Sequence, residues 1–405
     1  MTLGWFEGFG IEAEYMIVDQ KTLAVRPIAD EVLAQMAGGP ADEVELGLVA
    51  WSNELVLHVL ELKANGPQRE LKALHLAFVE ALRQMNQRLK AWGAKLLPTA
   101  MHPLFDPQTE TKLWPHGNRE IYQAYDRIFD CRGHGWSNLQ SLHINFPFEG
   151  DRQFVRLHDA IRLVLPLLPA LAASSPLEEG KATGQVDSRL FHYRRNQAKI
   201  PAIAGQVVPE RVSSSADYQE KILKPIYQAI APLDPQGILA EEWLNSRGAI
   251  ARFDRSAIEI RLLDLQECAV ADFALAALVI SLVQELATGP DALPVIPEQR
   301  LAAQLWGAAE QGRRWVIEDP EILGALGLEA NPTAVGDLWR SLVDRLTGQG
   351  LPLDNFLPQV YRLVQKDSLA RRILRGCGEG QAGILKVYGE LAQCLEEDWP
   401  YEPTA

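Results

Sequence analysis

The sequence predicts an α+β fold in which an antiparallel sheet is flanked by helices and followed by a helical C-terminal part. Four segments have the apolar and β-branched composition of strands, but they do not alternate strictly with helical segments. That order is more typical of an antiparallel sheet than of a doubly wound parallel one. After residue 298 the apolar residues follow helical periodicity with few strand signals. The predicted strands are 8–19, 54–64, 141–148 and 256–265.

The predicted helices lie between and after these strands. Their apolar residues recur with helical spacing, and the last helix is closed by Gly289-Pro290. Residues 289–297 have the composition of a linker. We therefore divide the chain into a mixed region, 1–290, and a helical region, 298–405, that packs on it. The predicted helices are 68–96, about 151–174, 216–231 and 271–289, and the predicted loops are 102–118 and 181–200.

Composition restricts the class of protein. The 405 residues are 47% apolar and 23% charged, which is typical of a globular protein with a core. A formal net charge of −14 argues against nucleic acid as a partner, because a phosphate backbone needs a surface rich in Lys and Arg. The most apolar run, 163–173, contains two prolines and is too short to span a bilayer, so we expect no membrane partner.

Cysteine usage and the first residues indicate a cytoplasmic protein. The four cysteines are far apart and form no C-x-x-C pair, so the sequence favours neither a disulfide framework nor a zinc knuckle. The start "MTLGWFEGFG" lacks the basic and apolar regions of a secretory signal. We expect small-molecule partners, and a homo-oligomer stays open.

Each of the four predicted strands has one apolar face and one face that carries acids, a histidine and a few bases. Residues two apart in a strand share a face. For a single strand the ordinary explanation is a solvated face. That explanation weakens for four strands together, because Glu and His replace the usual Lys, Thr, Ser and Gln. The polar pairs are Glu12 and Glu14, Glu61 and Lys63, His143 and Asn145, and Glu259 and Arg261.

Acids gathered on one sheet face predict a cation. Like charges repel unless a cation neutralises them. Glu and His without a thiolate suit Mg²⁺ or Mn²⁺. Glu54 lies seven residues before Glu61, so an unbroken strand would place the two on opposite faces. A bulge, or a position of Glu54 before the strand begins, would reconcile them.

Several ordered motifs resemble glutamate–cysteine ligase family 2 and related carboxylate–amine ligases, whose catalytic fold is shared with glutamine synthetase. The resemblance covers roughly residues 8–290 and rests on six motifs rather than one. It implies a funnel formed by a curved antiparallel sheet, with ATP entering at one end and the acceptor acid at the other. The motifs are "GFGIEAEYMIVD", "NELVLHVLELKANGP", "SLHINF", "ASSP", "GQVDSRLFHYRRNQAKIP" and "SRGAIARFDRSAIEIRLLDLQE".

The resemblance also implies a set of site residues. It places one Mg²⁺ on Glu14, Glu54 and Glu61, and a second on Glu12, His143 and Glu259. Glu259 and Arg261 are the implied catalytic pair, in which Arg261 stabilises the transferring phosphoryl group. Further bases are candidate clamps for phosphate or carboxylate, namely Lys63, Arg189, Arg194, Arg247 and Arg252.

The chemistry implied is amide formation driven by ATP. ATP phosphorylates a carboxylate to an acyl phosphate, two cations offset the charge on the phosphate oxygens, and an amine then displaces phosphate. The chain departs from the family pattern at Asn145, where one branch has a second histidine, and at Ala13, where many relatives have a third acid. These departures leave open which acid and which amine are joined.

Three rival functions remain open. A phosphotransferase with the same funnel would stop at a phosphorylated product. A non-catalytic sensor would keep the nucleotide fold without turnover. A metal-dependent amide hydrolase would use two cations to activate water. A dinucleotide or Walker-type phosphate loop is excluded, because "GFGIEAE" lacks the third glycine and carries acids where a pyrophosphate would bind.

Overall fold

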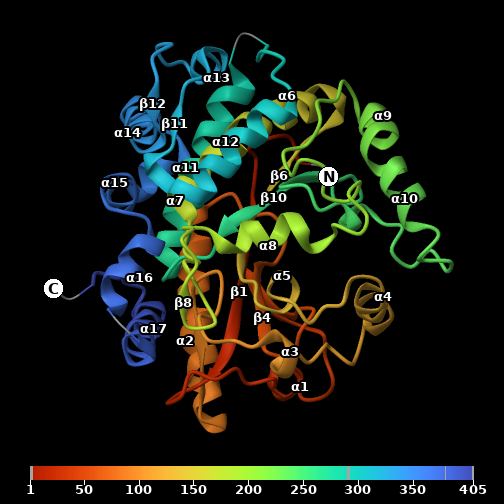
Figure 1. Cartoon of the computed structure of the whole chain (residues 1–405), viewed down its shortest axis with the longest axis vertical. Coiled ribbons are helices and arrows are strands. Elements are labelled where there is room, and N and C mark those ends of the chain that lie inside the picture. Colours follow the sequence, from red (N-terminus) through yellow and green to blue (C-terminus); the bar gives the residue numbers. More distant parts are fainter. Residues whose placement is uncertain (1–2, 290–291, 379, 404–405) are drawn as a thin grey trace.

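A computed structural model describes residues 3–289, 292–378 and 380–403 of the chain (Figure 1). Its main feature is an eight-stranded sheet in the order β2-β3-β4-β1-β6-β10-β9, with β5 paired to β1. Every pair in this sheet is antiparallel, which confirms the predicted fold class. The strands are β1 (Gly10–Asp19), β2 (Glu43–Leu46), β3 (Val49–Asn53), β4 (Val59–Ala64), β5 (Ala94–Leu97), β6 (Ser141–Pro147), β9 (Ala249–Arg252) and β10 (Ala257–Asp264).

The register of the strands brings the predicted polar residues into one row. Glu12 on β1 lies opposite Lys63 on β4 and opposite His143 on β6. Glu14 lies opposite Glu61, and Glu259 lies opposite Asn145. Residues opposite each other in antiparallel strands share a face. The polar pairs of separate strands therefore form one continuous surface.

The apolar face of the sheet is covered by three long helices. Ile11, Tyr15 and Ile17 are fully buried there, in one core with residues of α2, α6 and α11. The helices of this part of the chain are α1 (Ala29–Ala37), α2 (Leu71–Leu89), α3 (Pro107–Glu110), α4 (Arg119–Phe129), α5 (His134–Ser137), α6 (Gly150–Val164), α7 (Pro169–Ala172), α8 (Ser188–Asn196), α9 (Ser215–Tyr218), α10 (Lys224–Ile230) and α11 (Ala269–Thr288). Shorter helical turns lie at η1 (Lys90–Trp92), η2 (Leu165–Leu167), η3 (Gln219–Leu223) and η4 (Glu242–Leu244).

Helix α11 is the centre of the core. By length and composition it could cross a membrane, but 89% of its most apolar window is buried inside the protein. It packs against α2 and α6 on one side and against α14 and α15 on another. A helix that is apolar all round and enclosed by other helices is a core helix.

Several predicted boundaries were wrong. Of the strand expected at 54–64 only the second half is a strand, β4, because the chain turns at 54–58; β3 ends before the predicted range begins. The helix expected at 68–96 ends at Gly93, which has a left-handed conformation, and β5 follows. The helix expected at 151–174 stops at Val164 and continues as short turns, since two prolines follow.

The loop expected at 181–200 contains helix α8. Its start has a capping signal, because the carboxylate of Asp187 accepts a hydrogen bond from the backbone N–H of Leu190. A two-stranded hairpin of β7 (Leu177–Glu178) and β8 (Lys181–Ala182) precedes it. Of the predicted linker, residues 292–297 have neither helix nor strand, while 290–291 lie outside the described residues.

The C-terminal part is helical, as predicted, apart from one small two-stranded sheet. Its helices α13–α17 lie along one side of the molecule, drawn in blue in Figure 1. Buried residues of α13–α15 belong to the main core under the sheet, and most of those of α16 and α17 form a second cluster with Met16 and Val18 of β1 and Leu97 of β5, so the division of the chain near 290 stays a prediction. The elements are α12 (Glu298–Gln311), η5 (Gly312–Arg314), β11 (Val316–Ile317), α13 (Pro320–Ala325), β12 (Thr333–Ala334), α14 (Val335–Leu346), η6 (Pro352–Phe356), α15 (Leu357–Gln365), α16 (Leu369–Cys377) and α17 (Gly380–Glu397).

Candidate active site

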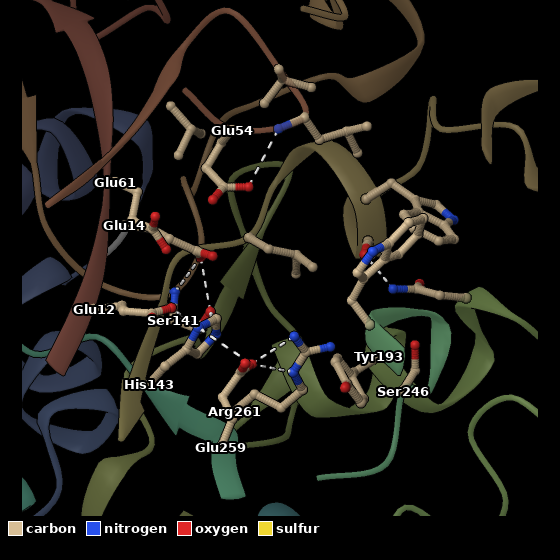
Figure 2. A pocket seen from close by; sticks show the side chains of 18 of the residues that line it. Glu12, Glu14, Glu54, Glu61, Ser141, His143, Tyr193, Ser246, Glu259 and Arg261 are labelled. Carbon is tan, nitrogen blue, oxygen red and sulfur yellow. Dashed lines mark hydrogen bonds and ion pairs between the residues drawn. The ribbon is translucent and has the colours of Figure 1, made fainter. Parts of the chain in front are cut away.

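A large cavity opens on the polar face of the sheet (Figure 2). It offers about 360 Å³ of space to a ligand, which lies within the usual range for a small-molecule site. All six predicted metal ligands line it, and so do four of the predicted basic residues. These are Glu12, Glu14, Glu54, Glu61, His143 and Glu259, with Lys63, Arg189, Arg252 and Arg261.

Hydrogen bonds hold the acids of β1 in place. Both the backbone N–H and the hydroxyl of Ser141 donate to Glu14 Oε2, at 2.7 and 2.8 Å. Asn145 donates to Glu12 Oε1 at 2.9 Å, and His143 Nδ1 lies 3.3 Å from Glu12 Oε2. The two carboxylates of the Glu-x-Glu motif are thus oriented separately, and each keeps a lone pair for the cavity.

The charges of the cavity perturb one another. Burial opposes ionisation of Glu12, but His143 outweighs it and lowers the pKa of Glu12 to about 2. Burial opposes protonation of His143, but Glu12, Glu259 and Glu14 raise the pKa of that imidazole to about 9. Burial and the neighbouring Glu12 raise the pKa of Glu61 to about 7. Burial, Glu14 and Glu61 raise the pKa of Glu54 well above its usual range.

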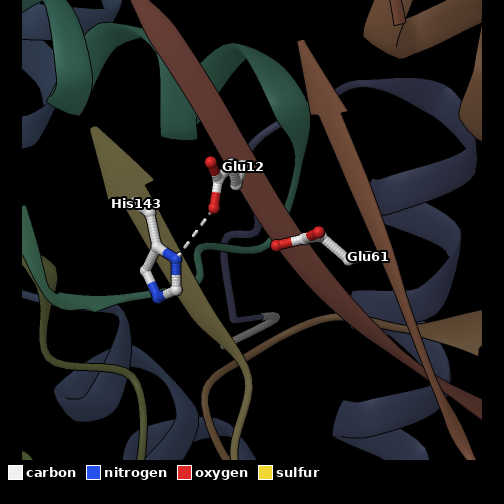
Figure 3. A group of neighbouring side chains, drawn as sticks. All are labelled: Glu12, Glu61 and His143. Atoms are coloured by element: carbon white, nitrogen blue, oxygen red, sulfur yellow. Dashed lines mark hydrogen bonds and ion pairs between the residues drawn. The ribbon is translucent and has the colours of Figure 1, made fainter. Parts of the chain in front are cut away.

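Three of the predicted metal ligands come especially close together. One ligand atom each of Glu12, Glu61 and His143 lies within 4.8 Å of the other two (Figure 3). Within the described residues, neither of the two implied trios is gathered this closely. The oxygen and imidazole donors suit Mg²⁺ or Mn²⁺. Burial and the charge of Glu12 raise the pKa of Glu61 although Lys63 Nζ lies 3.6 Å from Glu61 Oε2, so a further cation would be favourable there. The residues therefore fit a divalent cation.

Glu54 lies between two strands, which explains its spacing of seven residues from Glu61. Glu54 follows the end of β3 and precedes β4, so it is not on the same unbroken strand as Glu61. Its Oε2 accepts a hydrogen bond from the backbone N–H of Leu55 at 3.3 Å. Because Glu54 lies in this loop, its side chain can line the cavity together with Glu61. In an unbroken strand the two side chains would point to opposite faces.

The other end of the acidic row carries the Glu259–Arg261 pair. Arg261 donates to Glu259 Oε1 from Nε at 2.8 Å and from Nη2 at 2.6 Å. Arg252 Nη1 lies 3.7 Å from Glu259 Oε2. A bulge between Ile260 and Leu263 interrupts the pairing with β6 next to this pair. In Figure 2, Arg261 lies between the acids and Tyr193.

The remaining predicted clamps have other surroundings. Arg189 lines the cavity but is engaged by Asp264 at 2.6 Å and by the carbonyl of Leu262. Arg247 does not line the cavity, because its guanidinium is held by both oxygens of Glu210 at 2.5 and 2.7 Å. Arg194 lies over the rings of Phe191 and Trp306, also outside the cavity lining. A basic residue beside a motif in sequence thus need not share its site.

Sequence reasoning missed two groups of lining residues. Ser141 heads the "SLHINF" strand, two residues before His143, so strand alternation could have placed it on the polar face. The aromatic residues come from the helical segments α4, α5, α8 and η4, where no strand alternation marks them. They are Tyr122, Tyr125, Trp136, Tyr193 and Trp243.

Comparison with known proteins decides the family. The sequence model that describes glutamate–cysteine ligase family 2 matches residues 8–374 of the chain. The chain belongs to glutamate–cysteine ligase family 2. The match confirms the resemblance of the motifs and extends past residue 290, where those motifs end.

Two relatives align with nearly the whole length of the chain. The family member described here is 34% identical over 394 residues to an uncharacterised protein of Archaeoglobus fulgidus, with 97% of this chain and 99% of that protein covered. It is 24% identical over 393 residues to a protein of Rhodopirellula baltica provisionally named glutamate–cysteine ligase 2, covering 94% and 96% of the two chains.

Solved structures share the fold of this glutamate–cysteine ligase family 2 member. The glutamate–cysteine ligase of Francisella tularensis, in complex with AMP, has a TM-score of 0.65 at 15% identity, covering 100% of this chain and 91% of that one. A bifunctional glutathione synthetase of Pasteurella multocida has a TM-score of 0.63 at 15% identity, covering 97% and 53%. At this identity the similarity shows the fold alone.

Proposed function

We propose that the protein is an ATP-dependent ligase that joins an amino-acid carboxylate to an amine through an acyl phosphate. The observation that carries the proposal is the row of acids, His143 and Arg261 on one wall of one cavity in a member of this family. The AMP bound to the Francisella tularensis relative supports the use of a nucleotide. The substrates are small molecules, and the proposed location is the cytoplasm.

Divalent cations, Mg²⁺ or Mn²⁺, complete the proposed site. Glu12, Glu61 and His143 would hold one, because their donor atoms already converge. Glu14, Glu54 and Glu259 line the same cavity and would supply the remaining ligands. When bound, the cations would neutralise negative charge on the phosphate oxygens of ATP.

The chain's own groups have distinct parts in this proposal. Arg261 presents a planar guanidinium at the end of the acidic row, which suits the charge of a phosphoryl group in transfer. Glu259 holds that guanidinium by two hydrogen bonds to one oxygen. Ser141 and Asn145 fix the orientation of Glu14 and Glu12 before any ligand arrives. The tyrosines and tryptophans of the opposite wall limit access of water, which would hydrolyse an acyl phosphate.

The test is a screen of ATP turnover to ADP against pairs of amino acids and amines, with product analysis. The wild type is expected to form ADP, phosphate and an amide with at least one pair. Glu259→Gln should abolish turnover, while Glu396→Gln, an exposed change outside the cavity, should not. If wild type and Glu259→Gln behaved alike with every pair, the ligase proposal would be abandoned.

The same screen separates the rival functions. A stable phosphorylated product formed without any amine would identify a phosphotransferase. Amide cleavage that needs cations but no nucleotide would identify a hydrolase. Nucleotide binding without turnover under any condition would identify a sensor.

A further inference from the structure

Three aromatic rings that line the cavity contact one another and form what we call the ring wall: Tyr125, Trp136 and Trp243. They come from α4, α5 and η4. The centroid of Tyr125 lies 5.2 Å from that of Trp136 and 6.0 Å from that of Trp243. Tyr125 is therefore the centre of the wall, and segments far apart in sequence build it together.

The ring wall is supported from behind. Phe129 stacks on Trp136 with centroids 5.6 Å apart and an interplanar angle of 27°, and it also contacts Tyr125. Phe129 is not among the residues that line the cavity. A second aromatic layer of this kind restricts the rotamers of the first. The rings that meet the cavity are thus held in position before a ligand binds.

The rings of the wall are accessible from the cavity. Tyr125, Trp136 and Trp243 are each only half-buried, and all three line the cavity. Among the described residues, the cation–π contacts belong to Arg194, which lies over Phe191 and Trp306 instead. Half-buried aromatic rings on the wall of a polar cavity are costly to leave in water, so a bound ring would remove that cost.

A buried acceptor next to the ring wall lacks a donor. Gln197 also lines the cavity and is only 6% exposed. Its Nε2 donates to Ser246 Oγ at 2.9 Å, and Ser246 Oγ in turn lies 3.4 Å from the carbonyl of Leu244. This chain of hydrogen bonds fixes the orientation of the amide. Its other end, Gln197 Oε1, is buried without a hydrogen-bond partner. A buried acceptor of this kind calls for a donor from a ligand or a water.

We propose that the ring wall and Gln197 form a subsite for a planar ring that carries an N–H donor, packed against Trp243 and Tyr125. The subsite rests on the proposed ligase function, because the ring would belong to one of the molecules that reach the acidic row. Two sources have this chemistry: the base of the nucleotide, and the ring of an aromatic amino acid or amine substrate. Both would lie across Arg261 from the acids, where Figure 2 shows Tyr193 and Ser246.

The experiment measures binding directly, so its result does not depend on turnover. Calorimetric titrations with Mg²⁺ present would compare four probes: ADP, inorganic tripolyphosphate, tryptophan as the ring substrate, and leucine as the aliphatic match. The proteins are wild type, Trp243→Ala, Tyr125→Ala and the conservative Tyr125→Phe. Trp399→Ala is the matched control, because Trp399 is 70% exposed and does not line the cavity.

The expected result is a selective loss of ring binding. Removing one stacked ring weakens binding by about tenfold or more, from the known contribution of base–aromatic stacking. Loss for ADP with unchanged tripolyphosphate binding assigns the subsite to the nucleotide base. Loss for tryptophan with unchanged leucine binding assigns it to a substrate. Trp399→Ala should bind every probe as the wild type does, and Tyr125→Phe, which keeps the ring, should lose less ring binding than Tyr125→Ala.

Gln197 gives a second, independent variant for the nucleotide arm. Adenine has an exocyclic amine that can donate to Gln197 Oε1, whereas hypoxanthine has a carbonyl at that position. Wild type should therefore bind ADP more tightly than IDP, and Gln197→Met should lose this preference. The proposal is overturned if the wild type binds no ring-bearing probe more tightly than its ringless match, or if Trp243→Ala and Tyr125→Ala bind every probe as the wild type does.

Discussion

Arg261 donates two hydrogen bonds to a single carboxylate oxygen of Glu259, two residues earlier on the same strand. The pair shares one face of β10, and Arg261 lies within the irregular stretch between Ile260 and Leu263. Glu259 is 2% exposed, so its charge is balanced by the guanidinium rather than by water. This bond orients Arg261 toward the cavity that both residues line.

Replacing Arg261 by Lys should therefore reduce activity much more than stability. Lys keeps the positive charge but lacks the planar fork that meets Glu259 and a phosphoryl group at once. We expect kcat/KM for ATP turnover to fall by about a hundredfold or more, from the loss of one preorganised donor. Steady-state kinetics and thermal unfolding would be measured together. Arg194→Lys is the control, because Arg194 does not line the cavity; equal activity of the two variants would contradict the role of Arg261.

The acidic row should make the metal-free protein less stable as pH rises. The folded pKa of Glu61 is raised to about 7 and that of His143 to about 9. Both groups bind protons more tightly in the folded chain than in the unfolded one. Their contribution is present at low pH, and it is lost as pH rises through about 7 for Glu61 and about 9 for His143. In EDTA the melting temperature should be higher at pH 6 than at pH 8.5.

Divalent cations should reverse this trend. Mn²⁺ competes with protons for Glu61 and its neighbours, so the gain in melting temperature on adding Mn²⁺ should be larger at pH 8.5 than at pH 6. Glu61→Gln should weaken Mn²⁺ binding, followed by electron paramagnetic resonance, by about tenfold or more. Glu396→Gln should bind Mn²⁺ as the wild type does. A Mn²⁺ effect that is the same at both pH values would argue against a cation on these residues.

Arg247 should be needed for stability rather than for binding. Its guanidinium bonds Glu210 and the backbone carbonyl of Ala202, which tie a loop to the strand region before β9. Arg247→Met leaves Glu210 without its partner and should lower the free energy of unfolding by about 2–3 kcal/mol, at the lower end for such pairs because Glu210 keeps some solvent contact. Urea unfolding measures this. ADP affinity of the folded variant should stay at the wild-type value, and a selective loss of affinity would instead place Arg247 in the site.

The C-terminal segment should stabilise the central helix. Asp398 accepts a hydrogen bond from the backbone N–H of Val270 at 2.7 Å, and its other oxygen lies 2.8 Å from His75. The residue before α11, Cys268, provides no side-chain cap, so Asp398 takes that part from a distant point of the chain. Asp398→Ala should cost about 1–2 kcal/mol of unfolding free energy, as expected for a lost cap. If Glu396→Ala were equally destabilising, the capping role would be rejected.

The hydrogen bond between Asp398 and Val270 joins the two parts into which we divide the chain near residue 290. A fragment of residues 1–290 would lose Asp398 and the helices that cover α11. We expect this fragment to be insoluble or unfolded by circular dichroism, whereas the full chain unfolds cooperatively. A folded fragment would support independent domains.

The sequence by itself determined the antiparallel class of the sheet and the identity of the acidic row. Period-two alternation puts Glu12 and Glu14, or Glu259 and Arg261, on one face of a strand whatever the rest of the fold is. Family motifs then identified which strands belong together. These are local properties, because they depend on the backbone of one strand and on the order of motifs.

Only the tertiary structure decided which other side chains reach the cavity. Arg189, Arg194 and Arg247 are all close to motifs in sequence, yet the fold engages two of them in ion pairs and stacks the third on aromatic rings. Glu54 reaches the site because β3 ends before it, and the ring wall assembles from three separate segments. Such contacts depend on strand register and on how helices and loops pack across the sheet. The periodic pattern of a single segment does not predict these contacts between segments.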